Sequence, residues 1–199
     1  MDDHAPEAQL LTPDELAGAW SAHRAGRFGL MTIRPPVEKP DLATAVRAAI
    51  TTTTAHLTGH VLGNSFDVNM GLSGIERLLA DLDDTTTKKG WKRRFGTPDA
   101  FAVGMTRLAE CLTSAHTAPA AGRSFYAQFL AEAGPTTGID FGAAVHSAED
   151  ARTQWAGIAD TAATATEPDV TIPELALRVG SVLEVERRLI AELQQALTR

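Results

Sequence analysis

Apolar residues recur at intervals of three and four positions along most of this chain, and that spacing is typical of helices with one buried face. Polar or glycine-rich breaks separate one periodic stretch from the next. The pattern predicts seven helices, at approximately residues 12–24, 41–60, 72–82, 97–112, 124–133, 147–158 and 171–197. The predicted fold class is therefore mostly α, a compact bundle of about seven helices with one short N-terminal β-strand.

Several of the predicted helices begin at a start signal. Ser, Thr or Asp at an N-cap accepts a hydrogen bond from the first turn, and a Glu three residues later completes a capping box. Such signals occur at Thr12 with Glu15, Thr97 with Pro98, Ser147 with Asp150, and Thr171 with Glu174. Gly134, Pro135 and Gly138 predict a loop, and Gly71 with Gly74 predicts a close approach between backbones.

The strand is predicted from the apolar run Phe28 to Ile33, which Pro35 and Pro36 end. An isolated strand leaves its backbone groups without hydrogen-bond partners, and no convincing second strand follows it. We therefore expect this strand to pair with a second polypeptide. The expected domains are a loose tail at 1–11, a helix–strand extension at 12–36, and a helical domain at 37–199.

Composition narrows the functional classes. The formal net charge of −7 argues against a general nucleic-acid binder, because phosphate binding favours a basic surface. The single cysteine excludes an internal disulfide and suits a reducing compartment. The acidic start lacks the features of a signal peptide, and no apolar run approaches the roughly 20 residues that cross a bilayer. We expect a cytoplasmic protein without a membrane or nucleic-acid partner.

Two kinds of side chain are candidates for catalysis. Cys111 is a possible nucleophile, but it lies near Leu108 and Leu112 without a basic neighbour that would lower its pKa, which favours a structural place in the core. His56 and His60 are four residues apart and share one helix face. Ordinary packing or hydrogen bonding is the simpler interpretation, and acid–base or substrate contact is the alternative. No third metal ligand is evident, so we expect no metal.

Polar residues at two breaks are candidates for substrate binding. Asn64, Asp67 and Asn69 are common turn formers, yet loops after helices often line binding sites. Arg123 follows Gly122 at a predicted helix start, where exposed amides and a guanidinium suit a carboxylate, a sulfate or a phosphopantetheine phosphate. The alternative is that Arg123 pairs with a carboxylate and holds the loop.

A basic cluster interrupts the acidic chain at Lys88, Lys89, Lys92, Arg93 and Arg94. Such a patch would steer an acidic carrier protein toward this surface. The alternative is an ordinary solvated helix face, with the neighbouring Trp91 as a core anchor. Both interpretations stay open.

Three segments resemble the C-terminal helical domain of the butirosin biosynthesis protein H family. They are residues 40–50 with Gly71 to Ile75, residues 121–133, and Trp155 to Ala159 with Glu184 to Leu193. The second segment looks like the family's glycine-rich, Tyr-x-x-Phe-Leu motif, onto which Arg123 and Tyr126 fall. It departs from that motif because the glycines are thinned to Ala120, Ala121 and Gly122, and the Phe before the Arg is missing.

The resemblance implies an enzyme subunit in natural-product or antibiotic biosynthesis that handles a carrier-tethered acyl or aminoacyl intermediate, by acyl transfer or cyclisation. In that family a papain-like half precedes the helical half, and residues 10–36 look like its end. A second subunit would supply that half, as in split, aziridine-forming azinomycin-type cyclase complexes. Tyr126 is then a catalytic candidate beside His56 and His60, and no cofactor is implied beyond phosphopantetheine or an amino-group carrier on the substrate. The alternative is a non-catalytic carrier-docking or stabilising module.

Overall fold

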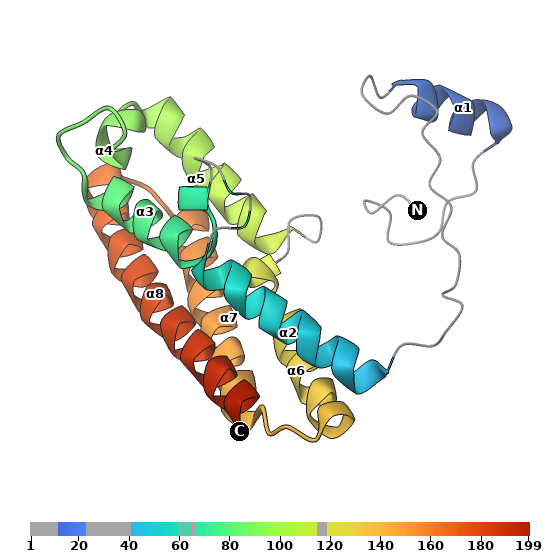
Figure 1. The fold of residues 1–199 in the computed structure, drawn as a ribbon. Helices are drawn as coiled ribbons and strands as arrows, with labels where there is room; N and C mark the ends of the chain where they lie inside the picture. The colour runs from blue at the N-terminus through green and yellow to red at the C-terminus, as the bar shows by residue number, and fades with distance from the viewer. Residues whose placement is uncertain (1–11, 23–40, 60, 62, 64–66, 115–118) are drawn as a thin grey trace. The chain divides into compact units, whose positions relative to one another are not determined.

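Eight α-helices and two 3₁₀ turns make up the described part of this computed structural model, which comprises residues 12–22, 41–59, 61, 63, 67–114 and 119–199 (Figure 1). The elements are α1 (Pro13–Ala22), α2 (Leu42–Thr58), η1 (Asp67–Asn69), α3 (Gly71–Asp83), α4 (Trp91–Arg94), α5 (Pro98–Thr113), η2 (Pro119–Gly122), α6 (Arg123–Thr137), α7 (Gly142–Ala163) and α8 (Pro168–Thr198). The mostly helical fold class is confirmed. The predicted strand from Phe28 to Ile33 lies outside the described residues.

The chain divides into two compact units, residues 1–40 and 41–199. In the first unit, α1 begins at the predicted capping box. The Thr12 N–H donates to Glu15 Oε2 over 2.8 Å, and the Glu15 N–H donates back to Thr12 Oγ1 over 3.3 Å. These two bonds satisfy donors that the first turn of a helix leaves open.

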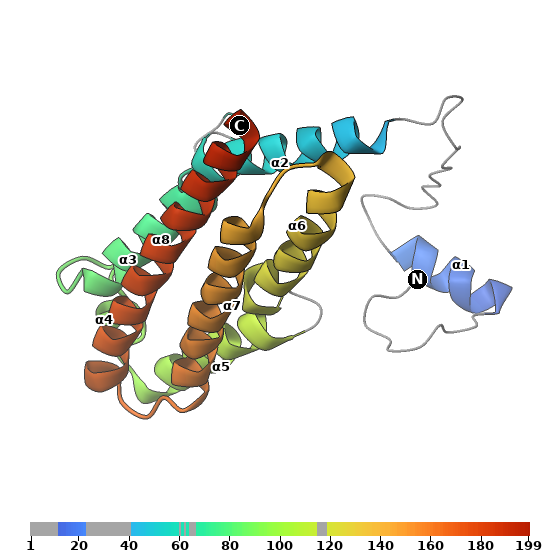
Figure 2. The same cartoon turned by 90° about the horizontal axis from the view of Figure 1, so that it is seen from below.

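The second unit is built around α7 and α8, which pack along each other more extensively than any other pair of described helices. Helix α3 packs on α8, α5 and α6 pack on α7, and α2 contacts α6, α8 and α3. Figure 2 shows α6, α7 and α8 side by side, with α2 running across their ends. Within the described residues, no helix is both long enough and apolar enough to cross a membrane.

Two apolar clusters share the α7–α8 pair. The first, here the α3–α5 cluster, joins α3 and α5 to the end of α7 and the beginning of α8. Its members include Leu82, Phe101, Met105, Ile158, Leu175 and Val179. The second, here the α2–α6 cluster, joins α2 and α6 to the other halves of α7 and α8. It includes Ile50, Leu130, Phe141, Ala148, Leu189 and Leu193.

Two helices begin before their predicted start signals. Helix α7 begins at Gly142, whose N–H donates to the Asp140 carboxylate over 2.8 Å, and Ser147 is buried inside the helix. Helix α8 begins at Pro168, so Thr171 and Pro173 lie in its interior. Proline suits the first helical position at Pro168, and burial of Thr171 and Ile172 supports the extra turn.

Helix α6 continues through Gly134 and Pro135, where a loop was predicted, and ends at Gly138 with φ of 71°. Glycine adopts this left-handed conformation without the steric penalty of a side chain. Arg47 of α2 donates to the carbonyl oxygen of Thr137 over 2.7 Å. A contact between distant helices therefore supports the last turn of α6, and local sequence does not reveal it.

Candidate functional site

A buried ion pair lies between the two apolar clusters. Arg123, the first residue of α6, donates from Nε to Glu186 Oε1 over 2.7 Å and from Nη2 to Glu186 Oε2 over 3.0 Å. Trp155 of α7 donates from its indole Nε1 to the same Oε1 over 2.9 Å. Three helices thus contribute one residue each to a connected polar group.

Glu186 is more deeply buried than its ion-pair partner Arg123. Its side chain is 1% exposed, whereas that of Arg123 is 16% exposed. A carboxylate so far from water needs both an opposite charge and hydrogen-bond donors, and Arg123 and Trp155 supply them. The loop-holding alternative for Arg123 therefore matches the observed contacts, and an external anion would have to compete with Glu186 for the guanidinium.

A cavity of about 160 Å³ opens beside this ion pair. Its described lining comes from α2, α3, α6, α7 and α8 and consists of Leu57, Gly71, Leu72, Ile75, Arg123, Trp155, Glu186 and Ile190. The walls are mainly aliphatic, and the polar atoms belong to the ion pair and the indole. The arrangement suits a small ligand that is apolar over most of its surface.

Glycines bring the walls of the cavity together. Gly71 has φ of +52°, and a Cβ atom on it would lie 2.3 Å from the carbonyl oxygen of Leu57. A Cβ atom on Gly74 would lie 2.5 Å from the carbonyl oxygen of Asn69. The predicted close approach at the start of α3 is confirmed, and it seats α3 against the end of α2.

The turn before Arg123 is left-handed at three successive residues. Ala120, Ala121 and Gly122 have φ of 48°, 55° and 69°. A left-handed conformation costs a residue with a side chain about 1–2 kcal/mol, so glycine is the favoured residue at such positions. This geometry gives a physical reason for a glycine-rich segment here. The carbonyl of Ala121 also accepts from Arg123 Nη1 over 3.3 Å, which ties the turn to the ion pair.

The histidine and turn candidates are only partly described. His56 is exposed on α2 and does not line the cavity, although the adjacent Leu57 does. His60 and Asn64 lie outside the described residues. Asp67 and Asn69 belong to η1, directly before α3, and Asn69 is exposed. Roles in catalysis or substrate binding for these residues stay predictions.

Tyr126 lies one turn along α6 from Arg123, and its ring stacks on Phe129 with the centroids 6.1 Å apart. Its hydroxyl oxygen is buried and has no hydrogen-bond partner among the described residues. Burial raises the pKa of Tyr126 to about 12, and the charge of Arg123 opposes that rise. The phenol therefore keeps its proton at neutral pH, which makes it a donor rather than a general base.

The basic cluster lies on an ordered turn after α3, which holds Lys88 and Lys89, and on α4, which holds Lys92, Arg93 and Arg94. Asp84 accepts from the backbone N–H groups of Thr86 and Thr87 over 2.7 and 2.9 Å, and also from the Thr87 hydroxyl. A Cβ atom on Gly90 would lie 1.7 Å from the carbonyl oxygen of Asp84, so the turn requires glycine there. This turn, residues 84–90, leads into α4 and is called the basic turn below.

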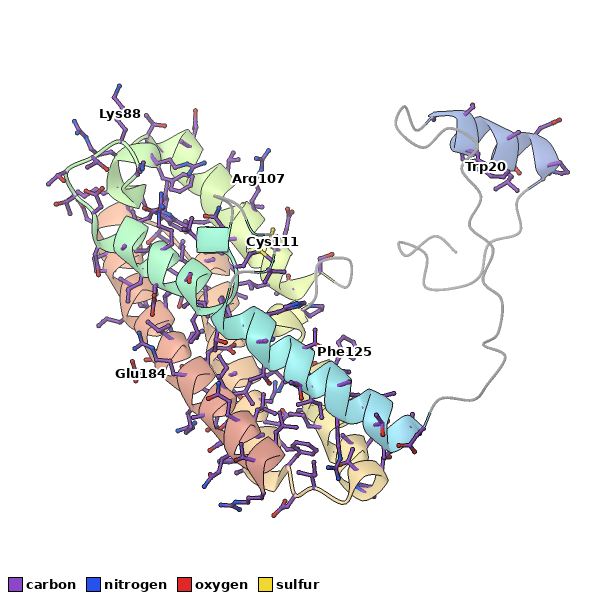
Figure 3. The ribbon with its side chains drawn as sticks, viewed as in Figure 1. Trp20, Lys88, Arg107, Cys111, Phe125 and Glu184 are labelled. Atoms are coloured by element: carbon purple, nitrogen blue, oxygen red, sulfur yellow. The ribbon has the colours of Figure 1, made fainter. Side chains whose placement is uncertain are left out.

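All five basic candidates on and after this turn are exposed, but they differ in their contacts. Lys92 pairs with Asp169 over 2.8 Å, Arg93 donates to the carbonyl oxygen of Thr86 over 2.6 Å, and the guanidinium of Arg94 lies 5.8 Å from the centroid of the Phe95 ring. Trp91 packs against the α3–α5 cluster, in line with its interpretation as an anchor. Lys88 projects from the turn in Figure 3.

The predicted core position of Cys111 is wrong. Phe101, Met105, Leu108 and Leu112 form the stripe of α5 that packs on the core, whereas Cys111 is exposed. Each residue advances about 100° around a helix, so Cys111 lies roughly 100° from its neighbour Leu112 and off the stripe. Figure 3 shows its sulfur on α5.

Sequence patterns alone do not identify two members of the polar group, Trp155 and Glu186, as candidate site residues. Glu186 nevertheless occupies a position in the apolar register of α8, between Val182, Leu183 and Ile190. A lone carboxylate in such a register is a detectable signal, because burying it requires a partner. Among the described residues, no three His, Cys, Asp or Glu side chains come together as metal ligands.

A family model described as "Domain of unknown function (DUF4872)" matches residues 14–193, which includes the cavity and the basic turn. No curated protein and no solved structure matches the chain.

Proposed function

The chain belongs to the family described as a domain of unknown function (DUF4872), and from that premise we propose that it is the helical subunit of a natural-product biosynthetic enzyme. In this proposal it binds a carrier protein that bears an acyl or aminoacyl group. A second subunit supplies the papain-like half and its nucleophile. The resemblance to the butirosin biosynthesis protein H family supports this choice of reaction class.

The observation that carries the proposal is the basic turn together with α4, which follows it. Five exposed cations gather on a chain whose formal net charge is −7, and hydrogen bonds within the turn hold its backbone. Acyl carrier proteins are acidic, so this surface complements them. A patch of one sign speeds encounter with a partner of the other sign and orients it.

The cavity beside Arg123 provides the second part of the proposal. It lies within the same unit as the basic turn, and its aliphatic walls suit the acyl end of a substrate. No nucleophile lines it among the described residues, since its polar members are a paired Arg, a paired Glu and an indole. Chemistry supplied by another chain is consistent with that lining.

Carrier docking is tested by reversing charge on the basic turn. Lys88→Glu with Lys89→Glu leaves the Lys92–Asp169 pair and the Arg93–Thr86 bond in place. We expect binding of an acyl carrier protein from the neighbouring genes, measured by titration calorimetry at low salt, to weaken about ten-fold, mainly through slower association. Arg107→Glu on α5, which makes half the change in charge, is the control, because Arg107 is exposed and lies away from Lys88 (Figure 3). Equal losses in both variants, or no loss in either, would refute docking at this turn.

The non-catalytic alternative, a module that only docks or stabilises, is favoured by one observation. Glu186 and the Ala121 carbonyl already engage the guanidinium of Arg123. Replacing His56 by Ala and Tyr126 by Phe in the co-expressed two-chain complex separates the two functions. Loss of turnover with assembly intact favours a shared active site, whereas unchanged turnover favours the module.

A further inference from the structure

In the ion pair beside the cavity, the charges of Arg123 and Glu186 neutralise each other without a ligand. Both oxygens of Glu186 accept from Arg123, and Oε1 also accepts from Trp155. We infer that the cavity binds the uncharged, mainly apolar end of a ligand, a short aliphatic chain or a single small ring, and that it selects against carboxylates. The inference rests on the proposed function for the statement that this group is the acyl end of a carrier-bound substrate.

The volume limits the size of the ligand. The cavity measures about 160 Å³. A protein cavity of roughly 150 Å³ that is lined by aliphatic and aromatic side chains stays dry and admits benzene. The group that fits is therefore on the order of six non-hydrogen atoms, and a long fatty acyl chain is too large.

The lining limits the polarity of the ligand. Leu57, Leu72, Ile75 and Ile190 supply aliphatic walls. These side chains offer no hydrogen bonds, so every polar atom that a ligand places against them loses its contact with water. A chain that ends in one amide or thioester carbonyl keeps that carbonyl near the ion pair and the rest against the aliphatic walls.

The charge of Glu186 sets the selectivity. Its carboxylate is 1% exposed and borders the cavity. A ligand carboxylate would meet this like charge at short range, and it would gain Arg123 only by displacing Glu186, which would leave a buried charge without its partner. A neutral ligand meets no such repulsion. This reasoning replaces the sequence-based expectation that Arg123 serves an anionic group directly.

The test compares butyramide with butyrate, which have the same number of non-hydrogen atoms and differ in charge, on the full chain. Benzene serves as a probe of volume alone. The indole N–H of Trp155 is the NMR reporter, and Trp20→Phe and Trp91→Phe assign it. We expect butyramide and benzene to shift this signal and butyrate to bind at least about ten-fold more weakly than butyramide. Butyrate binding as tightly as butyramide, or a Trp155 signal that neither neutral probe moves, would overturn the inference.

Two substitutions that fill the cavity locate the binding. Leu72→Phe and Leu57→Phe place a ring in the cavity, and we expect each to abolish the butyramide shift while the helical circular dichroism is retained. Leu108→Phe is the matched control, since Leu108 is also half-buried but lies on α5 and does not line the cavity. A butyramide shift that survives both folded cavity variants contradicts the assignment. If the chain binds butyramide but no carrier protein, the proposed function is refuted and this inference stands. If it binds a carrier protein but not butyramide, this inference is refuted and the proposed function stands.

Discussion

Among the described residues, Glu186 is the one carboxylate whose side chain is buried. It lies in the apolar register of α8, and its only described hydrogen-bond donors come from α6 and α7. Burying an ion pair does not by itself stabilise a fold, but breaking one leaves a charge in a medium that solvates it poorly. Removing one partner should therefore destabilise the fold more than the intact ion pair stabilises it.

We expect Glu186→Ala to lower the free energy of unfolding by about 3 kcal/mol or more, because Arg123 remains buried without its carboxylate. Urea denaturation measures the loss. Glu149→Ala is the control, since Glu149 pairs with Arg152 while both side chains are 44% exposed, and exposed pairs contribute about 0.5 kcal/mol. Replacing Arg123 and Glu186 together by Met and Leu should restore much of the stability. Equal costs for Glu186→Ala and Glu149→Ala would contradict the burial of this pair.

The titration of Tyr126 reports the burial of its own side chain, because it is the only tyrosine in the chain. Burial raises its pKa in the folded protein to about 12, above the value of about 10 in an unfolded chain. The folded state therefore holds the proton more tightly. The resulting contribution to stability is complete below pH of about 10 and is lost as the pH rises toward about 12.

Two measurements check this prediction. Tyrosinate absorbance of the folded chain should rise near pH 12 rather than near pH 10. Tyr126→Phe should remove this part of the fall in unfolding free energy between those two pH values, and the comparison with the native chain cancels the lysines that titrate in the same range. A normal titration near pH 10 in the folded chain would show that the phenol is accessible.

At the scale of the element, the backbone conformation of the basic turn depends on Gly90 rather than on helical hydrogen bonds. Hydrogen bonds to Asp84 from the Thr87 side chain, and then from the backbone N–H groups of Thr87 and Thr86, hold the pKa of Asp84 well below its usual range. The same turn places Gly90 against the Asp84 carbonyl, where a side chain has no room. Lys88 and Lys89 are thus presented on a defined backbone.

We expect Gly90→Ala to destabilise the fold by about 1–3 kcal/mol, the usual cost of forcing atoms into occupied space. Gly180→Ala is the matched control, because a Cβ atom on Gly180 has nothing within 4 Å and the residue lies inside α8. That substitution should stabilise by about 0.5–1 kcal/mol, since alanine is the better helix former. Thermal unfolding shows whether each substitution lowers or raises the stability. Changes in stability of the same sign for both substitutions would contradict the steric argument.

The start signals show how far an element can be predicted. Thr12 and Thr97 act as predicted, because the side chain of each accepts a hydrogen bond from the first turn of its helix. Ser147 does not, since the segment before it is rich in alanine and its hydroxyl accepts from Arg188 of α8 over 3.1 Å. Glu174 accepts from Thr161 of α7, besides its neighbour Arg178 on α8. Tertiary partners replaced the local ones.

At the scale of the whole molecule, the two apolar clusters are tied together because α7 and α8 run through both. We expect residues 41–199 to unfold in a single transition, so that Leu130→Ala in the α2–α6 cluster and Met105→Ala in the α3–α5 cluster each lower the unfolding free energy by about 2–5 kcal/mol. Helical circular dichroism and the fluorescence of Trp91 and Trp155, followed in a Trp20→Phe background, should shift together.

The matched positions make this test specific. Leu130 is fully buried and Met105 is 2% exposed, so both substitutions leave a cavity of comparable kind. A fluorescence transition that stays in place while circular dichroism shifts in Leu130→Ala would mean that the clusters unfold separately.

The sequence by itself determined most of the helical segments, though not α4, the end of α6 or the beginnings of α7 and α8. It also determined the glycines at the start of α3, because helical hydrogen bonds and steric limits act between residues that are close along the chain. It also indicated Arg123 as a residue of interest. Only the tertiary structure decided that Arg123 meets Glu186, which lies 63 positions away, that Trp155 joins them, and that a cavity opens beside the three. Such pairings depend on how helices pack, and the periodicity of one helix carries no record of which neighbour faces it.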